Sequence, residues 1–352
     1  MKILLVADVH LVEKLEEAHR WDVFNKVVDI CHCEHISHVC FMGDTWDKMD
    51  RYGAALVNRS VEVLTDLTRQ GIKVAVLQGN HDYKKEGVSF WDFLNAFQGI
   101  QYITKPSKLV WGDGGSESPL FLPFSPNPKE DWASIPLQDF PLIFIHQTLA
   151  GSLVDGGRKI EKEPHALPIF PRGVTIYAGD VHCPQTIGRV TYVGTPHATR
   201  FGEDWPGRFL IIDTDNPSAF RAVPLTSVKK EILNISSVAE LGALASKKSL
   251  STGDHIRVRC ALSKDNFTEW SEIEMAIRHW ADSNELVLAS VEGSVEERID
   301  ADGSESQISS EGSIEQMSPE DIVRLFAKEE NLGEPVILEG LKLIQTVREN
   351  AK

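Results

Sequence analysis

Three largely apolar segments near the N-terminus are each followed by side chains of the kind that bind metals, and this pattern constrains the fold most. The segments are residues 2–7, 38–42 and 72–77, and stretches with helical periodicity separate them. Apolar runs of this length are typical of buried strands in parallel sheets. The alternation of strand and helix therefore predicts an α/β sheet with its polar groups gathered at one edge.

The side chains at these strand ends are Asp8 and His10, then Asp44, then Asn80 and His81. Alternation along an extended chain sends Asp8 and His10 to the same side, where both could bind one cation. Taken alone, each motif is also typical of a turn: an aspartate with an incidental histidine, or a capped turn with a surface histidine. Buried carboxylates and imidazoles cost free energy unless they are paired or metal-bound, so their repetition favours a metal site.

Two later strands end in the same way. Residues 141–145 lead into His146, and residues 174–178 lead into Asp180 and His182. Carboxylates, an amide and imidazoles together suit a pair of divalent ions with one bridging carboxylate. Because the set contains no cysteine, it favours manganese, magnesium or iron over structural zinc.

Composition narrows the class of protein. A chain of 352 residues predicts two domains, and a net charge of −16 opposes non-specific attraction to nucleic acid. The five cysteines have no disulfide-framework spacing and are expected to be reduced thiols, and the Cys- and His-rich run at 31–40 lacks the paired spacing of a zinc site. No apolar run could span a bilayer and no signal-peptide pattern is present, so we expect a cytoplasmic globular protein.

The order of predicted elements divides the chain into four segments. A small α+β unit with strands at 230–236, 254–260 and 286–292 has no ligand-type residues at its strand ends. A stretch rich in Ser, Glu, Gly and Asp cannot bury enough apolar surface to fold, and amphipathic helices suited to docking follow it. The predicted segments are 1–224 (main domain), 225–292 (α+β domain), 293–317 (acidic linker) and 318–352 (C-terminal helices).

The motifs together resemble those of the calcineurin-like metallophosphoesterases. That family carries Asp-x-His, Gly-Asp-x-x-Asp, Gly-Asn-His-Asp/Glu, a strand-end His and Gly-His-x-His. The chain has Asp8-Val9-His10, Gly43-Asp44-Thr45-Trp46-Asp47, Gly79-Asn80-His81-Asp82, His146 and Gly179-Asp180-Val181-His182. The resemblance covers about residues 1–215. It implies an α/β fold with a two-layered β-sheet sandwich flanked by helices.

The resemblance also implies roles for these residues. Asp8, His10 and His182 would bind one metal, Asn80 and His146 the other, and Asp44 would bridge the two. Asp180 stands where the family usually has a histidine, and we expect it to be a ligand as well. Two divalent ions would thus be bound, with manganese expected and magnesium or iron as alternatives.

The resemblance places His81 beside the scissile phosphate, where it could protonate the leaving oxygen or stabilise developing charge. Asp82 is expected to orient His81. Both residues are therefore candidate catalytic groups.

Within the superfamily, the chain most resembles the SbcD-type DNA repair nucleases. The grounds are Tyr192-Val193-Gly194-Thr195-Pro196, then Phe201-Gly202-Glu203, and the small α+β domain in the position of a cap domain. This implies a manganese-dependent exonuclease or endonuclease with DNA as substrate, a homodimer through helices near residues 54–97, and an SbcC-like SMC-type ATPase bound by the C-terminal helices.

The acidic charge requires that DNA contacts come from the partner or from local cations. The candidates for direct contact are Lys84, Lys85 and Arg200, with Arg158, Lys159 and Arg189 as further basic positions. Two alternatives remain open. One is a stand-alone phosphatase or small-molecule phosphodiesterase, and the other is a scaffolding subunit whose site is weakened by Asp180.

Overall fold

The computed structural model describes residues 1–47, 51–84, 88–108, 118–154, 157–161, 170–262, 269–295, 338 and 341–342. The chain divides into two compact units, Met1–Glu296 and Glu297–Lys352, and all of the described sheets lie in the first. The predicted C-terminal helices fall almost entirely outside the described residues, as do residues 296–317 of the predicted linker. No helix within the described ranges is long and apolar enough to cross a membrane.

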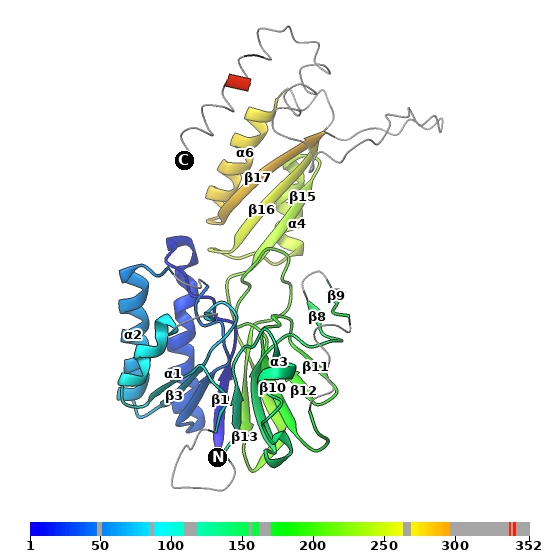
Figure 1. The fold of residues 1–352 in the computed structure, drawn as a ribbon. Coiled ribbons are helices and arrows are strands. Elements are labelled where there is room, and N and C mark those ends of the chain that lie inside the picture. Colours follow the sequence, from blue (N-terminus) through cyan, green and yellow to red (C-terminus); the bar gives the residue numbers. More distant parts are fainter. Residues whose placement is uncertain are drawn as a thin grey trace. The chain divides into compact units, whose positions relative to one another are not determined.

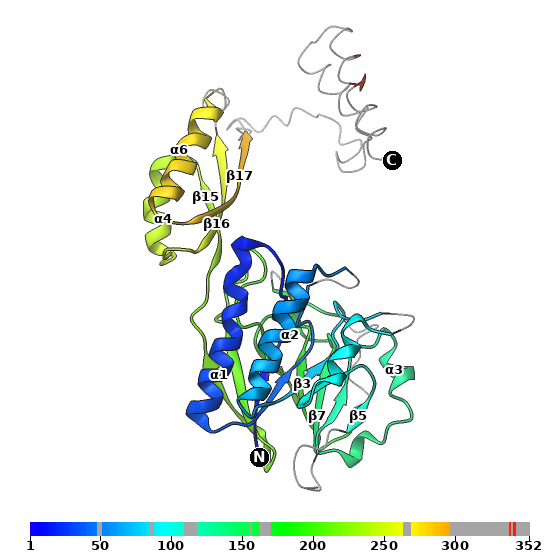
Figure 2. The same ribbon diagram turned by 90° about the vertical axis from the view of Figure 1, so that its left-hand side faces the viewer.

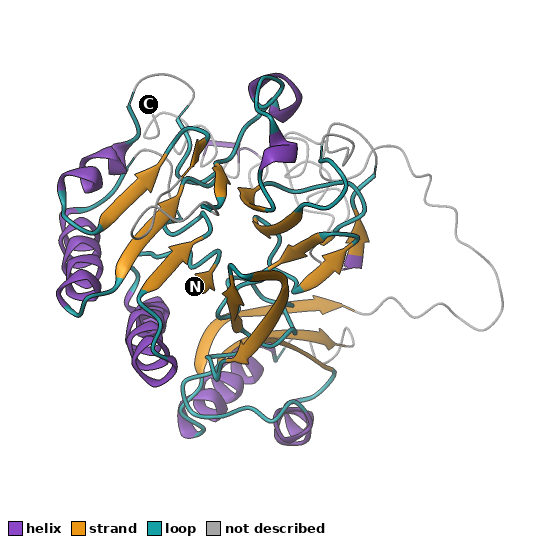
Figure 3. Ribbon diagram, turned by 90° about the horizontal axis from the view of Figure 1, so that it is seen from below, coloured by secondary structure: helices purple, strands orange, loops and turns teal. Residues whose placement is uncertain are grey.

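The first sheet has six strands in the order β14-β13-β1-β2-β3-β4. Figure 1 labels β1, β3 and β13 of this sheet, and Figure 3 shows the strands of the protein with helices beside them. The strand β1 runs parallel to β2, β2 to β3 and β3 to β4, whereas β13 pairs antiparallel with β1. The parallel strands are buried along nearly their whole length, as their continuous apolar sequences predict. Their bounds are β1 Lys2–Val6, β2 His38–Phe41, β3 Lys73–Leu77, β4 Ile100–Ile103, β13 Arg208–Asp213 and β14 Asn216–Pro224.

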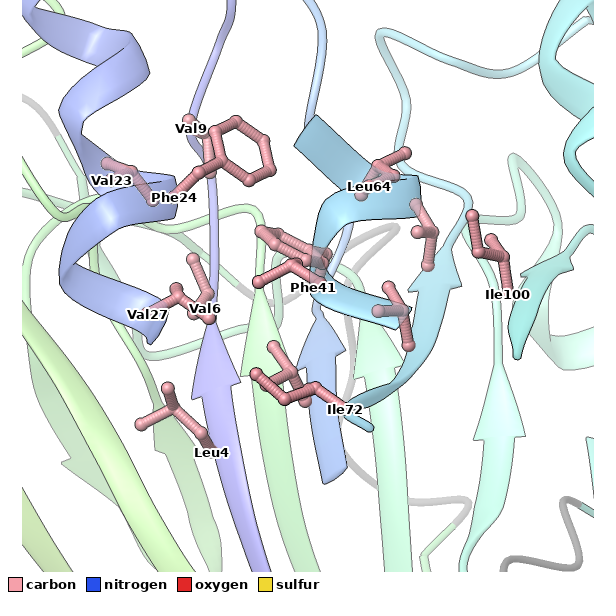
Figure 4. Packing of buried hydrophobic residues seen from close by; sticks show 14 of the residues in the cluster. Leu4, Val6, Val9, Val23, Phe24, Val27, Phe41, Leu64, Ile72 and Ile100 are labelled. Atoms are coloured by element: carbon pink, nitrogen blue, oxygen red, sulfur yellow. The ribbon is translucent and has the colours of Figure 1, made fainter. Parts of the chain in front are cut away.

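Two amphipathic helices, α1 (Asp22–Glu34) and α2 (Ala54–Arg69), cover the outer face of this sheet. Figure 4 shows Phe24 and Val27 of α1 and Leu64 of α2 in the same apolar cluster as Val6 and Phe41 of the strands. Burial of these side chains away from water is the main force that fixes the helices on the sheet.

The start of the first helix differs from the prediction. The apolar periodicity of residues 16–30 predicts a single helix, but a 3₁₀ helix, Leu15–Trp21, comes first, and α1 begins at Asp22. The 3₁₀ segment buries Arg20 and Trp21. Periodicity detects the apolar face but not the tighter winding of the first turns.

The second sheet also has six strands, in the order β11-β12-β10-β7-β6-β5. Side chains from both sheets form one buried cluster between them, including Leu5 and Cys40 from the first and Phe144 and Tyr177 from the second. The predicted two-layered sandwich flanked by helices is therefore confirmed. The strands are β5 Ser107–Lys108, β6 Leu120–Leu122, β7 Leu142–His146, β10 Thr175–Gly179, β11 Gln185–Ile187 and β12 Val190–Tyr192.

A third sheet, here called the cap sheet, consists of β15 (Lys230–Ile235), β16 (His255–Leu262) and β17 (Val287–Val295), all parallel. The helices α4 (Leu241–Lys247) and α6 (Trp270–Ser283) pack on it around their own apolar cluster (Figure 2). These elements lie within a few residues of their predicted positions.

The end of β17 corrects one boundary. Residues 293–295 were predicted to belong to the linker, but they pair with Cys260, Ala261 and Leu262 of β16. Backbone pairing does not require apolar side chains, so the polar composition after residue 292 did not reveal it.

Candidate metal centre

The strand ends of both large sheets bring the predicted polar residues to one edge of the sandwich. In the first sheet, β1, β2 and β3 are parallel, so the residues after them meet at the same edge. In the second sheet, β7 and β10 are also parallel neighbours, and His146 is the last residue of β7. The groups brought together are Asp8, His10, Asp44, Asn80, His81, His146, Asp180 and His182.

The backbone is left-handed at four of these positions. The φ angles are +53° at Asp8, +50° at His10, +47° at Asp44 and +81° at Asp180. Aspartate and histidine tolerate this region better than most residues, but it still costs free energy. Hydrogen bonds between the loops compensate, with the His10 N–H donating to the Asp44 carbonyl at 2.9 Å. The bent strand ends are thus held before any ligand binds.

Glycines stand where the ligands approach the backbone most closely. A Cβ added at Gly79 would lie 2.1 Å from Asp44 Oδ1 and 2.3 Å from its backbone nitrogen. At Gly43 an added Cβ would lie 2.0 Å from His146 Nδ1, and φ there is +98°. The glycine in each of these two motifs is therefore required by the packing of the polar groups.

The first group of potential ligands consists of Asp8, His10 and His182, all buried, with ligand atoms within 4.8 Å of one another. The Nε2 atoms of His10 and His182 lie 3.2 Å apart. Asp8 Oδ1 accepts a hydrogen bond from the Asp180 backbone N–H at 3.0 Å, whereas Oδ2 is buried with no hydrogen-bond partner among the described residues. A buried carboxylate oxygen left without a partner is a place where a cation fits.

The second group is built around Asp44. Its Oδ1 lies 3.4 Å from His146 Nε2, and its Oδ2 lies 3.7 Å from His10 Nε2. Asp180 Oδ1 lies 3.8 Å from His146 Nε2. Asp44 therefore stands between the two groups, as a bridging ligand must.

Asn80 shows how the second group responds to charge. One terminal atom of its carboxamide lies 3.0 Å from Asp44 Oδ2, 3.2 Å from Asp180 Oδ1 and 2.9 Å from His146 Nε2. Without a cation, the amide NH₂ can donate to the two carboxylates from that place. A half-turn of the amide would put its oxygen there instead, where it could bind a divalent ion. The donor set of oxygens and imidazole nitrogens therefore fits a dinuclear metal site.

Each imidazole is oriented by a hydrogen bond at its other nitrogen. His146 Nδ1 donates to the Met42 carbonyl at 2.7 Å, and His10 Nδ1 donates to Asp47 Oδ1 at 3.0 Å. His182 Nδ1 donates to Glu203 Oε1 at 2.6 Å. These bonds leave Nε2 of each ring facing the site, which is the usual arrangement of metal-binding histidines.

The sequence predicts no role for Asp47 or Glu203. Asp47 is the last residue of the Gly-Asp-x-x-Asp motif, and Glu203 ends Phe201-Gly202-Glu203. For Asp47, its place in the motif could have indicated a role near the metal ligands. For Glu203 the contact with His182 depends on the fold, and no spacing rule predicts it.

The electrostatics favour a bound positive charge. Burial would raise the pKa of Asp44, but His146, His10 and His81 lower it well below its usual range. Burial would lower the pKa of His146, but Asp44 and Asp180 raise it well above its ordinary value. In the metal-free protein, protons on imidazoles thus balance the carboxylates, and a metal ion would replace them.

His81 is the most open of the motif histidines, with 30% of its side chain exposed. Its Nε2 lies 3.9 Å from Asp44 Oδ2, and its Nδ1 lies 3.3 Å from the Asp47 carbonyl oxygen. It also belongs, with His10 and Asp44, to a third group of possible ligands. The arrangement leaves His81 able to face a substrate.

Asp82 was predicted to orient His81. Its carboxylate is buried and accepts a hydrogen bond from the Gly79 backbone N–H at 3.3 Å. Burial raises its pKa well above the usual value, and the neighbouring Asp44 adds to the effect. The described contacts of the His81 imidazole are with His10, Asp44 and Asp47, so an orienting role for Asp82 stays a prediction.

A cavity of about 350 Å³ opens onto the metal groups. Two arginines, Arg158 and Arg200, line it together with the aromatic ring of Phe124. Arg158 belongs to the hairpin of β8 (Leu153–Val154) and β9 (Arg158–Lys159). The remaining lining residues are Asp44, Asn80, His81, Gln147, Thr148, Val154, Ile160, Asp180, Val181 and His182.

The predicted DNA-contacting residues differ in position. Arg200 lines the cavity, whereas Lys84 is exposed and is not among its lining residues. Lys85 lies outside the described residues. Arg158, which the sequence offered only as a basic loop residue, lines the cavity as Arg200 does.

Comparison with known proteins agrees with this geometry. Residues 1–191, more than half of the chain, match the family model of the calcineurin-like phosphoesterases. The chain is 28% identical over 112 residues to the DNA double-strand break repair protein Mre11 of Sulfurisphaera tokodaii, a match that covers 30% of this chain and 29% of that protein.

Among solved structures, the chain is similar to Yfce, a phosphoesterase from E. coli, with a TM-score of 0.34 and 14% identity, over 64% of this chain and all of that one. The family match covers every motif from Asp8 to His182 and coincides with the cluster of buried ligands at the sheet edge. The chain therefore belongs to the calcineurin-like phosphoesterase family.

Proposed function

We propose that this protein is a metal-dependent DNA nuclease that hydrolyses phosphodiester bonds. The observation that carries the proposal is the pair of ligand groups that share the neighbourhood of Asp44 and open onto one cavity. Similarity to a protein named for DNA double-strand break repair supports DNA as the substrate. Because that match covers less than a third of the relative, the substrate belongs to the proposal.

In this proposal Asp8, His10 and His182 would hold one divalent ion. Asn80, His146 and Asp180 would hold the other, and Asp44 would be shared by both. When bound, such a pair lowers the pKa of a shared water and polarises the phosphoryl oxygens. Manganese is the expected metal because the ligands are oxygen and imidazole nitrogen without thiolate, and magnesium or iron would suit the same set.

The protein's own groups supply the rest of the chemistry. His81 lies at the open side of the site and donates a proton to the leaving oxygen. Arg158 and Arg200 line the same cavity and bring positive charge to an anionic substrate. These local cations let a chain of net charge −16 bind a polyanion at this one place.

The proposal includes the partners that the sequence predicted. The C-terminal helices would dock on an SbcC-like SMC-type ATPase, the chain would form a homodimer, and the cap sheet would direct DNA toward the site. An ATPase that carries much of the DNA-binding surface would also explain the acidic charge of this chain.

The proposal is tested by a manganese-dependent cleavage assay on single- and double-stranded DNA. Wild type is expected to cleave at least one of them, with loss of cleavage in a chelator and recovery on adding manganese. p-Nitrophenyl phosphate and cyclic nucleotides serve as competing substrates. Hydrolysis of these alone would favour a small-molecule phosphatase or phosphodiesterase. Fewer than two manganese ions bound at saturation, with no cleavage, would favour a scaffolding subunit.

A further inference from the structure

A short loop joins the metal centre to the cap sheet. This connector loop, residues 199–203, contacts His182 with both of its ends. The Glu203 carboxylate accepts the His182 Nδ1 hydrogen bond at 2.6 Å, and the Thr199 hydroxyl lies 3.0 Å from the same nitrogen. Glu203 also accepts from the Thr199 backbone N–H at 2.6 Å, which closes the loop on itself.

The other side of the connector loop is held by the cap sheet. Lys230, the first residue of β15, donates from Nζ to the Thr199 carbonyl at 3.2 Å. The Gly202 N–H donates to the Lys230 carbonyl at 3.4 Å. Arg257 of β16 stacks over the Phe201 ring, 4.8 Å from its centroid. Two strands of the cap sheet thus hold the loop that orients His182.

A buried ionic cluster makes a second connection, to His10. Arg20 donates to the His10 carbonyl at 2.5 Å and to the Thr199 carbonyl at 3.3 Å. Glu17 accepts from Arg20 Nε at 2.8 Å and from Lys230 Nζ at 2.5 Å. The side chains of Lys230, Arg20 and Glu17 are only 3%, 6% and 12% exposed.

The charges of this cluster indicate that it does more than attach the cap sheet to the main domain. Apolar contacts could hold a cap at lower desolvation cost than three buried charges. Charged hydrogen bonds are directional, so they fix the carbonyls of His10 and Thr199 in place. Both carbonyls belong to residues at the first metal group: His10 is one of its possible ligands, and Thr199 contacts another, His182.

We propose that Lys230 and Arg257 of the cap sheet are positioning residues for the metal position formed by Asp8, His10 and His182. Displacement of the cap sheet then changes the orientation of His182 and the backbone at His10, and weakens metal binding at this position. The inference rests on the dinuclear site of the proposed function but not on DNA as the substrate.

The test is manganese binding to the metal-free full chain, measured by calorimetry. For Lys230→Met we expect one of two ions to bind about 10-fold or more weakly, the size of effect seen when groups that orient a ligand are removed. The other ion should bind as in wild type. Lys229→Met is the matched control, because Lys229 Nζ donates to the carbonyls of Lys248 and Ser249 in the neighbourhood of the cap sheet.

Further variants separate positioning from a merely structural role. Lys230→Arg retains a donor for the Thr199 carbonyl and is expected to restore the weakened ion. In Lys230→Met, Glu17 still accepts from Arg20 Nε, so thermal unfolding of each variant is measured beside metal binding, and Lys230→Arg should recover both. If Lys230→Arg recovers thermal stability but not metal affinity, or if Lys230→Met binds both ions as wild type does, the inference is overturned.

Arg257→Leu is an independent test. It should lower the affinity for the same ion, although it leaves Glu17, Arg20 and Lys230 unchanged. Wild type that binds fewer than two ions would overturn both this inference and the dinuclear site. Two ions bound without any DNA cleavage would overturn only the nuclease, and the loss of one ion in Lys230→Met would still support positioning by the cap sheet.

Discussion

Glu203 accepts a hydrogen bond from Nδ1 of His182 at 2.6 Å, and this bond decides which nitrogen of the ring faces the metal groups. Glu203→Gln keeps the size of the side chain but removes its charge. We expect metal affinity to fall about 10- to 100-fold, as for other partners that orient a ligand. Calorimetric titration with manganese measures the change. Glu240→Gln, on an exposed 3₁₀ helix of the cap, is the control, and equal losses in both variants would contradict the specific role of Glu203.

Asp180 takes the place of the histidine usual in the family, and it lies 3.8 Å from His146 Nε2. Asp180→Asn is expected to weaken one ion by about 10-fold or more, since a charged oxygen ligand is lost. Metal content after dialysis against low manganese reports the stoichiometry. Asp204→Asn changes an exposed carboxylate nearby and should leave two ions bound. Full retention of both ions in Asp180→Asn would show that this carboxylate is not a ligand.

His81→Ala tests the assignment of the proton donor. We expect turnover to fall by about 100- to 10,000-fold, the range for loss of a general acid, while two ions still bind. The measurement is kcat on a DNA substrate at saturating manganese. His279→Ala replaces an exposed histidine of α6 and should have no effect. Undiminished cleavage by His81→Ala would falsify the assignment.

Gly79 and Gly242 form a matched pair for the effect of one methyl group. Gly79→Ala places a Cβ 2.1 Å from Asp44 Oδ1, so we expect destabilisation by about 1–3 kcal/mol, together with weaker metal binding. Gly242→Ala in α4 meets open space and should stabilise by about 0.5–1 kcal/mol. Urea unfolding with and without manganese measures both. Equal behaviour of the two variants would contradict the close approach of Asp44.

One buried histidine, His38, and one partly buried histidine, His19, predict how stability depends on pH. Burial lowers the pKa of His38 to about 4, assisted by Lys73, and burial also lowers the pKa of His19 to about 4. The unfolded chain therefore takes up protons at a higher pH than the folded chain. Their contribution to stability is complete above the ordinary pKa of 6.5 and is lost as the pH falls from 6.5 toward 4.

Urea unfolding of the metal-free protein at several pH values between about 4 and 7.5 tests this pH dependence. The range extends to either side of about 6.5, the ordinary pKa of histidine. In His38→Gln the free energy of unfolding should fall less steeply toward acid than in wild type. His279→Gln, at an exposed position, should keep the wild-type slope. A His38→Gln slope equal to that of wild type would rule out the buried neutral histidine as a cause.

Much of the fold could be predicted from the sequence because buried parallel strands and amphipathic helices have simple periodicities. The strands after which Asp8, Asp44 and Asn80 follow were placed correctly, and parallel pairing then required these residues to meet. The layered sandwich came from the family resemblance rather than from periodicity. Its confirmation rests on apolar contacts such as those of Leu5 and Phe144 across the two sheets.

The parts that could not be predicted depend on contacts between distant positions. Glu17 meets Lys230 across 213 positions of sequence, and each alone is typical of a solvated surface charge. Their burial follows from the way the cap strand meets the first helical turns. Likewise, the sequence indicates only that Arg158 is a basic loop residue. Its position at the cavity follows from the pairing of β8 with β9.

The ligands come from both large sheets, and this has a consequence for the order of folding. Asp8 and His182 belong to one metal group but lie 174 positions apart, and β1 and β10 belong to different sheets. Contacts with such long sequence separation form late, after the loop-closure entropy has been overcome. The metal centre therefore forms only once the two sheets have packed. In refolding, the rate at which the chain gains tight manganese binding should report the closing of the sandwich, a step that helix formation alone would not reveal.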